Sequence, residues 1–442
     1  MLKSCDTMVA IPDTTTDGRM IFAKNSDRPA IECQPLVQHE RHTHPAGAVT
    51  KCQFVHFPQT ATTYRHVGSR PYWCWGYEHG FNEHQVVIGN EGLGSKNEEF
   101  DSPKLVGMEL IRLGLERAKT ATEAVEVMTA LITKYGQGKF SNDQDVRTYD
   151  NGYIIADPSE AYILETAGHD WAVKRASSAM GISNVYSLEE DWERLSPTAI
   201  AHAEARGWWT EDSARFNFAQ AYSHQEDRST GSGAMRRLRS CAVLSRDSGQ
   251  IDVQTMMALL SDHSDGNSPN EPFQTKISPG SSICVHHNND GGGGNTAASL
   301  VAHLCADGSQ LPVYWCSFYS PCLAVFLPMF IEGDLPLVLA VGDEHPSDDS
   351  PWWLFRQLSL AVRADGGDLI PQVRAQWKAF QNRLFASAYE VAQEGKRLIE
   401  QGHGAEARQR LTAYMEENVE AMLNTVRQML SNAKASTDIA AD

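Results

Sequence analysis

The sequence has no long uninterrupted apolar run. No segment approaches the ~18–20 apolar residues that a membrane-spanning helix requires, and the opening MLKSCDTMVAIP lacks the apolar stretch of a secretory signal. Basic clusters are also missing: the sequence has no run of four or more Lys or Arg, and its formal net charge is −18. We therefore expect a cytoplasmic protein without nucleic-acid or membrane partners, because binding to phosphates needs a basic patch.

Cysteine is sparse and irregularly spaced. The nine cysteines form no C-x-x-C pair, and nine in 442 residues lies far below the density of a disulfide scaffold. Most are expected to be buried thiols, which pack like small apolar side chains. Cys5 differs from the others, because it leads directly into a β-prone run at 7–11.

The first thirty residues predict a β-hairpin. The run at 7–11 and a second strand at 19–24 flank the segment PDTTTDG, which carries an Asp-Gly turn signal. Residues 25–29 close the second strand. Because the ends of an antiparallel hairpin meet, Cys5 should lie beside Asn25 and Asp27.

The residues at this end of the hairpin suit thiol chemistry. A thiolate needs positive charge nearby to lower its pKa from about 8.5, and Lys24 and Arg28 supply cations. An α-amine, with a pKa of about 7.7–8.0, can act as a general base near neutrality when a carboxylate such as Asp27 orients it.

Strand clusters alternate with helix pairs along the next 300 residues, which favours stacked antiparallel sheets flanked by helices. Helical spacing covers 103–135, and the Gly- and Ser-rich segments 224–235 and 262–295 are expected to be loops. The predicted strands are 85–90, 153–157, 161–166, 171–175, 180–184, 282–287 and 314–318.

The C-terminal segment predicts a helical hairpin. Apolar residues recur at helical spacing from Pro371 to about Ala433, and Gly402-His403-Gly404 divides the pattern into two helices. This hairpin is expected to pack on the main domain or on another subunit, which would make the protein a homo-oligomer through its C-terminal helices.

Several ordered motifs resemble one family. Cys5-Asp6-Thr7 and FAKNSDRP at 22–29 are similar to the opening of the secernin and dipeptidase A-like cysteine dipeptidases, which belong to the N-terminal nucleophile (Ntn) hydrolases together with bile salt hydrolase and penicillin V acylase. Further matches follow in order at 80–92, 150–175, 182–188, 216–219, 281–287 and 314–328.

The resemblance implies an α+β fold, a four-layer αββα sandwich of the Ntn-hydrolase type with the helical hairpin appended. The implied domains are a propeptide at 1–4, a hydrolase domain at 5–365 and a C-terminal helical extension at 366–442. Ordinary removal of Met1 needs a small second residue, and Leu2 is not small. Autocatalytic cleavage of the Ser4–Cys5 bond is therefore expected.

The resemblance also assigns the reacting groups. Cys5 matches the nucleophile, and its freed α-amine matches the general base. Asp27 matches the carboxylate that orients this amine. Lys24 lies where the acylases carry arginine; lysine is common in the dipeptidase branch, and it weakens the case for a bulky acyl substrate.

Two asparagines and an arginine complete the implied catalytic set. Asn184 resembles the oxyanion-hole asparagine and Asn90 a second donor; such donors contribute roughly 2.7–4 kcal/mol when aimed at developing charge. Arg236, Arg237 and Arg239 compete for the last catalytic position, and we favour Arg239.

Substrate contacts are predicted from their positions near these groups: Asn25, Arg28, Trp73, Tyr77 and Phe81. No cofactor and no metal is expected. The motif HERHTH at 39–44 is interpreted as a polar surface loop, because zinc needs a fourth ligand and rigid geometry. His286 and His287 are interpreted as pocket or core residues.

These observations together predict a cysteine-type dipeptidase that hydrolyses short peptides through a thioester on Cys5. One alternative is an amidase or acylase of the bile salt hydrolase or penicillin acylase type. A second alternative is a non-catalytic secernin-like protein with an interaction role in exocytosis. An intact set of the implied catalytic residues favours chemistry over this last role.

Overall fold

The computed structural model describes residues 4–97, 104–137, 139–141, 146–229, 231–263, 282–288 and 291–439. Two compact units emerge from the contacts within the chain. The first contains residues 4–22 and His39–Ile251, and the second contains Ala23–Gln38 and the residues from Asp252 onward. The predicted domain boundaries after residues 4 and 365 stay predictions, because these units group residues by contact only.

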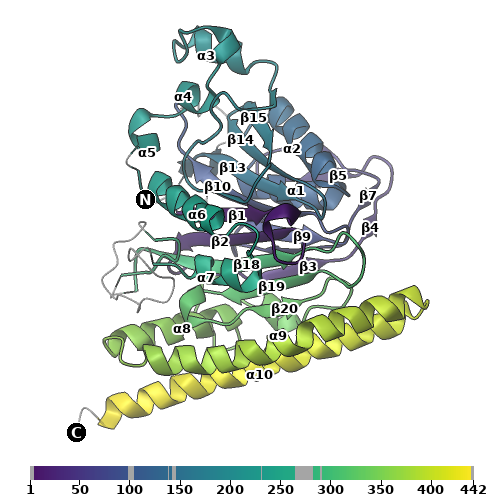
Figure 1. Cartoon of the computed structure of the whole chain (residues 1–442), viewed down its shortest axis with the longest axis vertical. Coiled ribbons are helices and arrows are strands. Elements are labelled where there is room, and N and C mark those ends of the chain that lie inside the picture. The colour runs from purple at the N-terminus through teal and green to yellow at the C-terminus, as the bar shows by residue number, and fades with distance from the viewer. Residues whose placement is uncertain are drawn as a thin grey trace. The chain divides into compact units, whose positions relative to one another are not determined.

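A large antiparallel sheet forms the centre of the first unit (Figure 1). Its strands lie in the order β17-β15-β14-β13-β10-β9-β8. The strands of this sheet carry apolar residues on both faces, and these residues are buried because another layer covers each face. The bounds are β8 (His66–Ser69), β9 (His79–Asn82), β10 (Val87–Leu93), β13 (Asp150–Ala156), β14 (Ala161–Ala167), β15 (Asp170–Arg175) and β17 (Arg194–Leu195).

Helices cover one face of this sheet and a second strand layer covers the other. α1 (Gly107–Arg117) and α2 (Ala121–Tyr135) pack on β9, β10 and β13–β15. β1 (Cys5–Ala10) and β16 (Met180–Ile182) pack on β10 and β13, and α6 (Ser232–Arg246) packs on β1 and β16. The two faces are distinguished by neighbouring side chains, since Tyr153 bonds the carbonyl of Gly107 in α1 whereas Glu91 bonds Thr7 in β1. The predicted αββα order is therefore confirmed within the first unit.

Short elements complete the first unit. Two-residue and three-residue strands form the pairs β4–β7, β5–β6 and β11–β12. Their bounds are β4 (His42–Thr43), β5 (Val49–Lys51), β6 (His56–Pro58), β7 (Thr62–Thr63), β11 (Lys139–Ser141) and β12 (Val146–Thr148). The remaining helices are η1 (Pro12–Thr14), α3 (Ala199–Ala205), η2 (Ser213–Arg215), α4 (Phe218–Tyr222) and α5 (Gln225–Ser229). The division of the sequence into units falls within β3 (Leu36–His39), after Gln38.

The second unit contains antiparallel strands. β18 (Gly294–His303), β19 (Val313–Phe318) and β20 (Leu327–Met329) are neighbours in this order. β2 (Ile21–Pro29) belongs to this unit from Ala23 onward, and its side chains bond residues of β18. The helices are α7 (Val253–Leu260), η3 (Pro321–Leu323), η4 (Leu337–Ala340), α8 (Pro351–Ala364), α9 (Ile370–Glu400) and α10 (Gly404–Ile439).

The predicted C-terminal hairpin is confirmed as α9 and α10, which lie side by side in the second unit (Figure 1). The chain turns at Gly402, whose φ of +80° belongs to the left-handed region that glycine adopts without strain. α9 contacts β19 and β20, while α10 contacts α8 and β20, so the hairpin packs on its own chain. Long as they are, neither of these helices nor any other that the structure describes combines the length and hydropathy needed to cross a membrane.

Two expectations about the Gly- and Ser-rich segments were wrong. The segment 224–235 was expected to be a loop, but α5 lies within it and α6 begins at Ser232. The strand expected at 282–287 is irregular, and a strand starts instead at Gly294, inside the expected loop. Residues 295–299 are small or polar and all buried, so they show no apolar alternation by which a strand is recognised. Residues 264–281, in the same expected loop, lie outside the described part.

We expect Leu384→Ala to destabilise the protein by about 2–5 kcal/mol, because it empties a fully packed position on the inner face of α9. Leu384 is 1% exposed, whereas Leu337 in η4 is 88% exposed and provides the matched control. Urea unfolding followed by circular dichroism measures both variants. Equal losses for Leu384→Ala and Leu337→Ala would contradict the packing of α9 against the sheet.

Candidate active site

Cys5 is the first residue of β1 and is buried, with 5% of its surface exposed. The pairing of β1 with β16 places Thr7 opposite Ile182, so Cys5 lies beside the residues that follow β16. The first of these contacts comes from Ser183, whose hydroxyl donates to the Cys5 carbonyl at 3.3 Å. The end of β16 thus provides one wall around the predicted nucleophile.

Asn184 and Arg236 hold the backbone of Cys5 from both sides. The Cys5 N–H donates to Asn184 Oδ1 at 2.8 Å, and Arg236 Nη1 donates to the Cys5 carbonyl at 3.0 Å. Arg236 Nη2 also donates to Asn184 Oδ1 at 2.8 Å. A single amide oxygen thus accepts from both groups, which fixes the direction of the Cys5 nitrogen. We call Asn184 and Arg236 the Cys5 clamp.

The cation of this clamp is neutralised by a neighbouring carboxylate. Arg236 Nη1 lies 2.6 Å from Asp6 Oδ2, and both side chains are fully buried. Breaking such a buried pair from one side is costly, since the remaining charge has no water to solvate it. The arginine approaches from α6, where Gly233 leaves no room for a side chain, because a Cβ there would come within 2.8 Å of the Asn184 carbonyl oxygen.

The structure corrects the choice among the three candidate arginines. Arg236, not the favoured Arg239, contacts Cys5. Sequence could not decide this, because the three lie within one helical turn and only the packing of α6 on β1 and β16 determines which one faces the nucleophile. Asp6, which the sequence analysis gave no role, is the residue that compensates its charge.

The two predicted oxyanion donors lie in different surroundings. Asn184 is in contact with Cys5, but its Nδ2 donates to the carbonyl of Gly92 at 2.8 Å. Asn90 is on the α1 side of its strand, opposite Tyr153, with its amide 2.8 Å from that of Asn151. The oxyanion roles therefore stay predictions, and the contact shown for Asn184 is to the Cys5 nitrogen.

The predicted site residues of β2 belong to the second unit and are held tightly there. Asn25 donates to the carbonyls of Leu260 and Ile283 at 2.8 and 2.9 Å, and accepts from Ser299. Lys24 is fully buried and its Nζ donates to the Asn25 carbonyl at 3.3 Å.

The last two predicted residues of this strand are also in defined contacts. Asp27 accepts from the Thr296 hydroxyl at 2.5 Å, and Arg28 pairs with Glu32 at 2.5 Å. The bonds of Asn25 and Arg28 to this unit indicate that both support the strand. A meeting of Cys5 with Lys24 and Asp27 stays a prediction of the hairpin.

The aromatic residues predicted to line the cleft are mostly interior. Tyr77 and Phe81 are almost completely buried, and Tyr77 bonds His66 at 3.0 Å between its hydroxyl and Nε2. Trp73 is partly buried against Cys74, Val106 and Met108. Among the three, Trp73 therefore keeps some exposed surface, whereas Tyr77 and Phe81 are interior.

Burial also makes the histidines of this region resistant to protonation. Burial lowers the pKa of His66 to about 3, with Arg112 adding to the effect, and burial lowers that of His39 to about 4. His39 stacks on His66 with ring centroids 5.1 Å apart. His39 of the HERHTH motif is therefore part of this neutral aromatic cluster, while His42 is exposed.

The sequence model described as peptidase family C69 matches residues 4–240, more than half of the chain and including Cys5 and the clamp. Two solved structures, an alanine mutant and a leucine variant of conjugated bile acid hydrolase from Clostridium perfringens, are each 12% identical and cover 71% of this chain and 89% of their own. Their TM-scores are 0.38 and 0.39. TM-scores this low carry no argument for the fold, which is established by the strands and helices described above.

We expect Arg236→Met to lower the free energy of unfolding by about 3–5 kcal/mol, because the Asp6 carboxylate would stay buried without its cation. Arg239→Met on the same helix is the matched control and should cost less than about 1 kcal/mol. Urea unfolding measures both. The double variant Asp6→Asn with Arg236→Met should lose less than the sum of the single losses, and strict additivity would contradict the pairing.

The neutral His66 predicts a pH-dependent stability. Its folded pKa of about 3 lies below the unfolded value of about 6.5, so its contribution is present above pH 6.5 and is lost as the pH falls. His66→Gln should therefore reduce the loss of stability between pH 7 and 5 by about 2 kcal/mol. Thermal unfolding at several pH values measures this, with the exposed His56→Gln as control. Identical slopes for His66→Gln and wild type would contradict a buried neutral imidazole.

Proposed function

Because the chain belongs to peptidase family C69, we propose that it is a dipeptidase that hydrolyses short peptides through a thioester on Cys5. Membership makes it a cysteine-type peptidase acting on amide bonds; the choice of dipeptides and of Cys5 is our proposal. The observation that carries it is the clamp, in which a partly buried asparagine and a buried arginine fix the backbone nitrogen and carbonyl of one cysteine.

The first chemical step would be removal of residues 1–4. The Cys5 thiolate attacks the Ser4 carbonyl, the Ser4–Cys5 amide bond breaks, and the acyl group moves to sulfur. Water then hydrolyses this thioester, which leaves a carboxylate on Ser4 and a free α-amine on Cys5. The N–H that donates to Asn184 Oδ1 before cleavage can keep this partner afterwards, so the new amine would be positioned as soon as it forms.

The same groups then support catalysis on substrate. The α-amine accepts the thiol proton, and the thiolate attacks the peptide carbonyl to give a tetrahedral intermediate. The ammonium returns the proton to the departing amine, and water hydrolyses the resulting thioester. Since the amine must be deprotonated to act as a base, its fixed direction toward Asn184 leaves its lone pair aimed away from this amide oxygen.

The residues of β2 have proposed roles that follow from the hairpin of the sequence. Asp27 would orient the amine, and Lys24 would favour the thiolate through its positive charge. The Thr296 hydroxyl holds one oxygen of Asp27, which gives this carboxylate a defined direction in the second unit. Asn184 would donate to the developing oxyanion once substrate binding rearranges its amide contact with Gly92. Asn90 lies on the face of its strand that carries α1, opposite the face on which β1 packs, so its expected oxyanion role has no support from this contact pattern.

We also propose a cytoplasmic location, small peptides as the partners of the site, and association of copies through α9 and α10. The formal charge of −18 supports peptides over nucleic acid and anionic membranes. The C-terminal helices already bury one apolar stripe against their own chain, so an association would use their outer faces.

Intact mass spectrometry tests the nucleophile and the processing together. Wild type should lose residues 1–4, whereas Cys5→Ala should keep them and lose dipeptidase activity by at least about 1,000-fold. Cys241→Ser, on the helix that carries Arg236, is the matched control and should be processed and active. An active preparation that retains Met1 would show that the α-amine is not the base.

A parallel substrate panel separates the candidate functions. Dipeptides, longer peptides, N-acyl amino acids and bile acid conjugates are offered to the processed protein, and kcat/KM is measured for each. The proposal expects the highest value for dipeptides. A preference for N-acyl amides would assign the acylase alternative, and no hydrolysis of any substrate by processed protein would favour an interaction role.

A further inference from the structure

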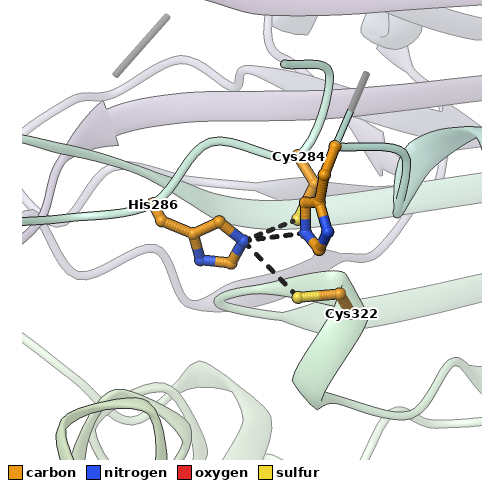
Figure 2. Close-up of side chains that lie close together, drawn as sticks. Cys284, His286 and Cys322 are labelled. Atoms are coloured by element: carbon orange, nitrogen blue, oxygen red, sulfur yellow. Dashed lines mark hydrogen bonds between the residues drawn. The ribbon is translucent and has the colours of Figure 1, made fainter. Parts of the chain in front are cut away.

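Four metal-ligating side chains converge inside the second unit. His263 follows α7, Cys284 and His286 lie in the segment 282–288, and Cys322 is in η3. One ligand atom from each lies within 4.8 Å of all the others. His263, Cys284 and His286 are buried, and Cys322 is partly buried. Figure 2 shows Cys284, His286 and Cys322 pointing toward a common centre. We call these four residues the Cys2His2 cluster.

The distances within this cluster match a tetrahedral zinc site. His286 Nε2 lies 3.0 Å from His263 Nε2 and 3.5 Å from each of the Cys284 and Cys322 sulfurs. Zinc–sulfur bonds of about 2.3 Å and zinc–nitrogen bonds of about 2.05 Å give edges of about 3.4 Å between nitrogens and about 3.6 Å between nitrogen and sulfur. The two nitrogen–sulfur distances from His286 Nε2 therefore agree with those of a zinc site, and its distance to His263 Nε2 is slightly shorter.

Local structure fixes these ligands without contributions from the metal. The backbone of Val285 exchanges bonds with Thr296 in β18, which turns the residues before and after it, Cys284 and His286, toward the same side. The Cys284 N–H donates to the carbonyl of Asp262 at 2.9 Å, next to His263. Three chain segments are thus brought together at one point.

Hydrogen bonding alone explains this arrangement poorly. His286 Nε2 faces a second imidazole nitrogen and two sulfurs, and one nitrogen can donate at most one proton. A cation at the centre would satisfy all four atoms at once through their lone pairs. Two thiolates would balance the charge of a divalent ion, so the buried site would be neutral.

We propose that the Cys2His2 cluster is a structural zinc site. The four donors are all protein side chains, which leaves no open position for a reacting water and distinguishes it from a catalytic zinc. On binding, the two thiols release their protons to solvent and the two neutral imidazoles donate lone pairs. This proposal departs from the expectation that the chain binds no metal, and it gives a role to His286, which is buried as a core residue would be.

A zinc ion at this position would support the strand that carries Lys24 and Asp27. Asn25 is held by the carbonyls of Leu260 in α7 and of Ile283, the residue before Cys284. Both carbonyls belong to segments that the ion would join. Zinc binding therefore stands independently of the dipeptidase proposal, and its effect on activity would be through the position of β2.

Metal content of the full-length protein is the direct test. Protein purified without chelator under reducing conditions should contain about one zinc ion per chain, as measured by inductively coupled plasma mass spectrometry. Cys322→Ser and His263→Gln should each lower this content at least about tenfold. Cys305→Ser, a buried cysteine of the same unit that bonds Asp307, is the matched control and should keep the zinc.

A cobalt titration keeps the proposal testable if the cluster variants fold poorly. Wild-type protein, stripped of metal and kept reduced, should bind one equivalent of Co²⁺ with the visible bands of a tetrahedral ion and a sulfur-to-metal charge-transfer band. Zinc should displace the cobalt. Absence of both zinc content and cobalt binding would overturn the proposal, as would a Cys284–Cys322 disulfide in peptide maps of protein that takes up no metal after reduction.

Removal of residues 1–4, which exposes the Cys5 amine, gives a readout that separates the zinc site from the proposed dipeptidase function. If zinc is present and its loss lowers thermal stability while residues 1–4 are still removed, the metal is structural and the dipeptidase proposal is untouched. If Cys5→Ala is inactive but the protein holds no zinc, only the metal proposal fails. Dipeptidase failure with a full zinc content would leave the site as assigned here.

Discussion

Arg236 reaches from α6 into the interior of the first unit, where it bonds Asp6, the Cys5 carbonyl and Asn184 without exposure to water. A buried guanidinium is tolerated only when its charge is balanced and its donors are used. Asp6 balances the charge. The other two acceptors are the Cys5 carbonyl, which Arg236 fixes directly, and Asn184 Oδ1, which in turn accepts from the Cys5 nitrogen. The close approach of α6 at Gly233 and the pairing of β1 with β16 both serve this contact.

Buried polar side chains of the second unit are also paired, here through amide hydrogen bonds and an ion pair. Asn25 uses both amide hydrogens and its oxygen within the unit, and Arg28 is paired with Glu32. β18 is built from small residues where it passes these side chains, so Ser299 and Thr296 can reach Asn25 and Asp27. The Cys2His2 cluster lies beside this strand and belongs to the same polar interior, which explains why α7, η3 and the segment 282–288 converge there.

The strands and helices with clear periodicity were predictable, and those without it were not. The runs at 7–11, 153–157 and 161–166 are β-prone apolar segments next to turn signals, and they correspond to β1, β13 and β14. α9 and α10 have apolar stripes at helical spacing. β18 lacks a recognisable pattern because small residues fill a layer that is buried on both faces, and the Gly- and Ser-rich start of α6 resembles a loop.

The sequence by itself determined the class of protein, the nucleophile expected at Cys5 and the order of the main elements, because motif spacing and hydrophobic period are properties of the chain alone. Tertiary structure decided which arginine faces Cys5, that Asp6 balances it, and that Asn90 lies on the α1 side of its strand. It also brought together His263, Cys284, His286 and Cys322, whose separations along the chain match no zinc motif. Contacts of this kind depend on how helices and strands pack, and no local pattern records which side chains will meet across them.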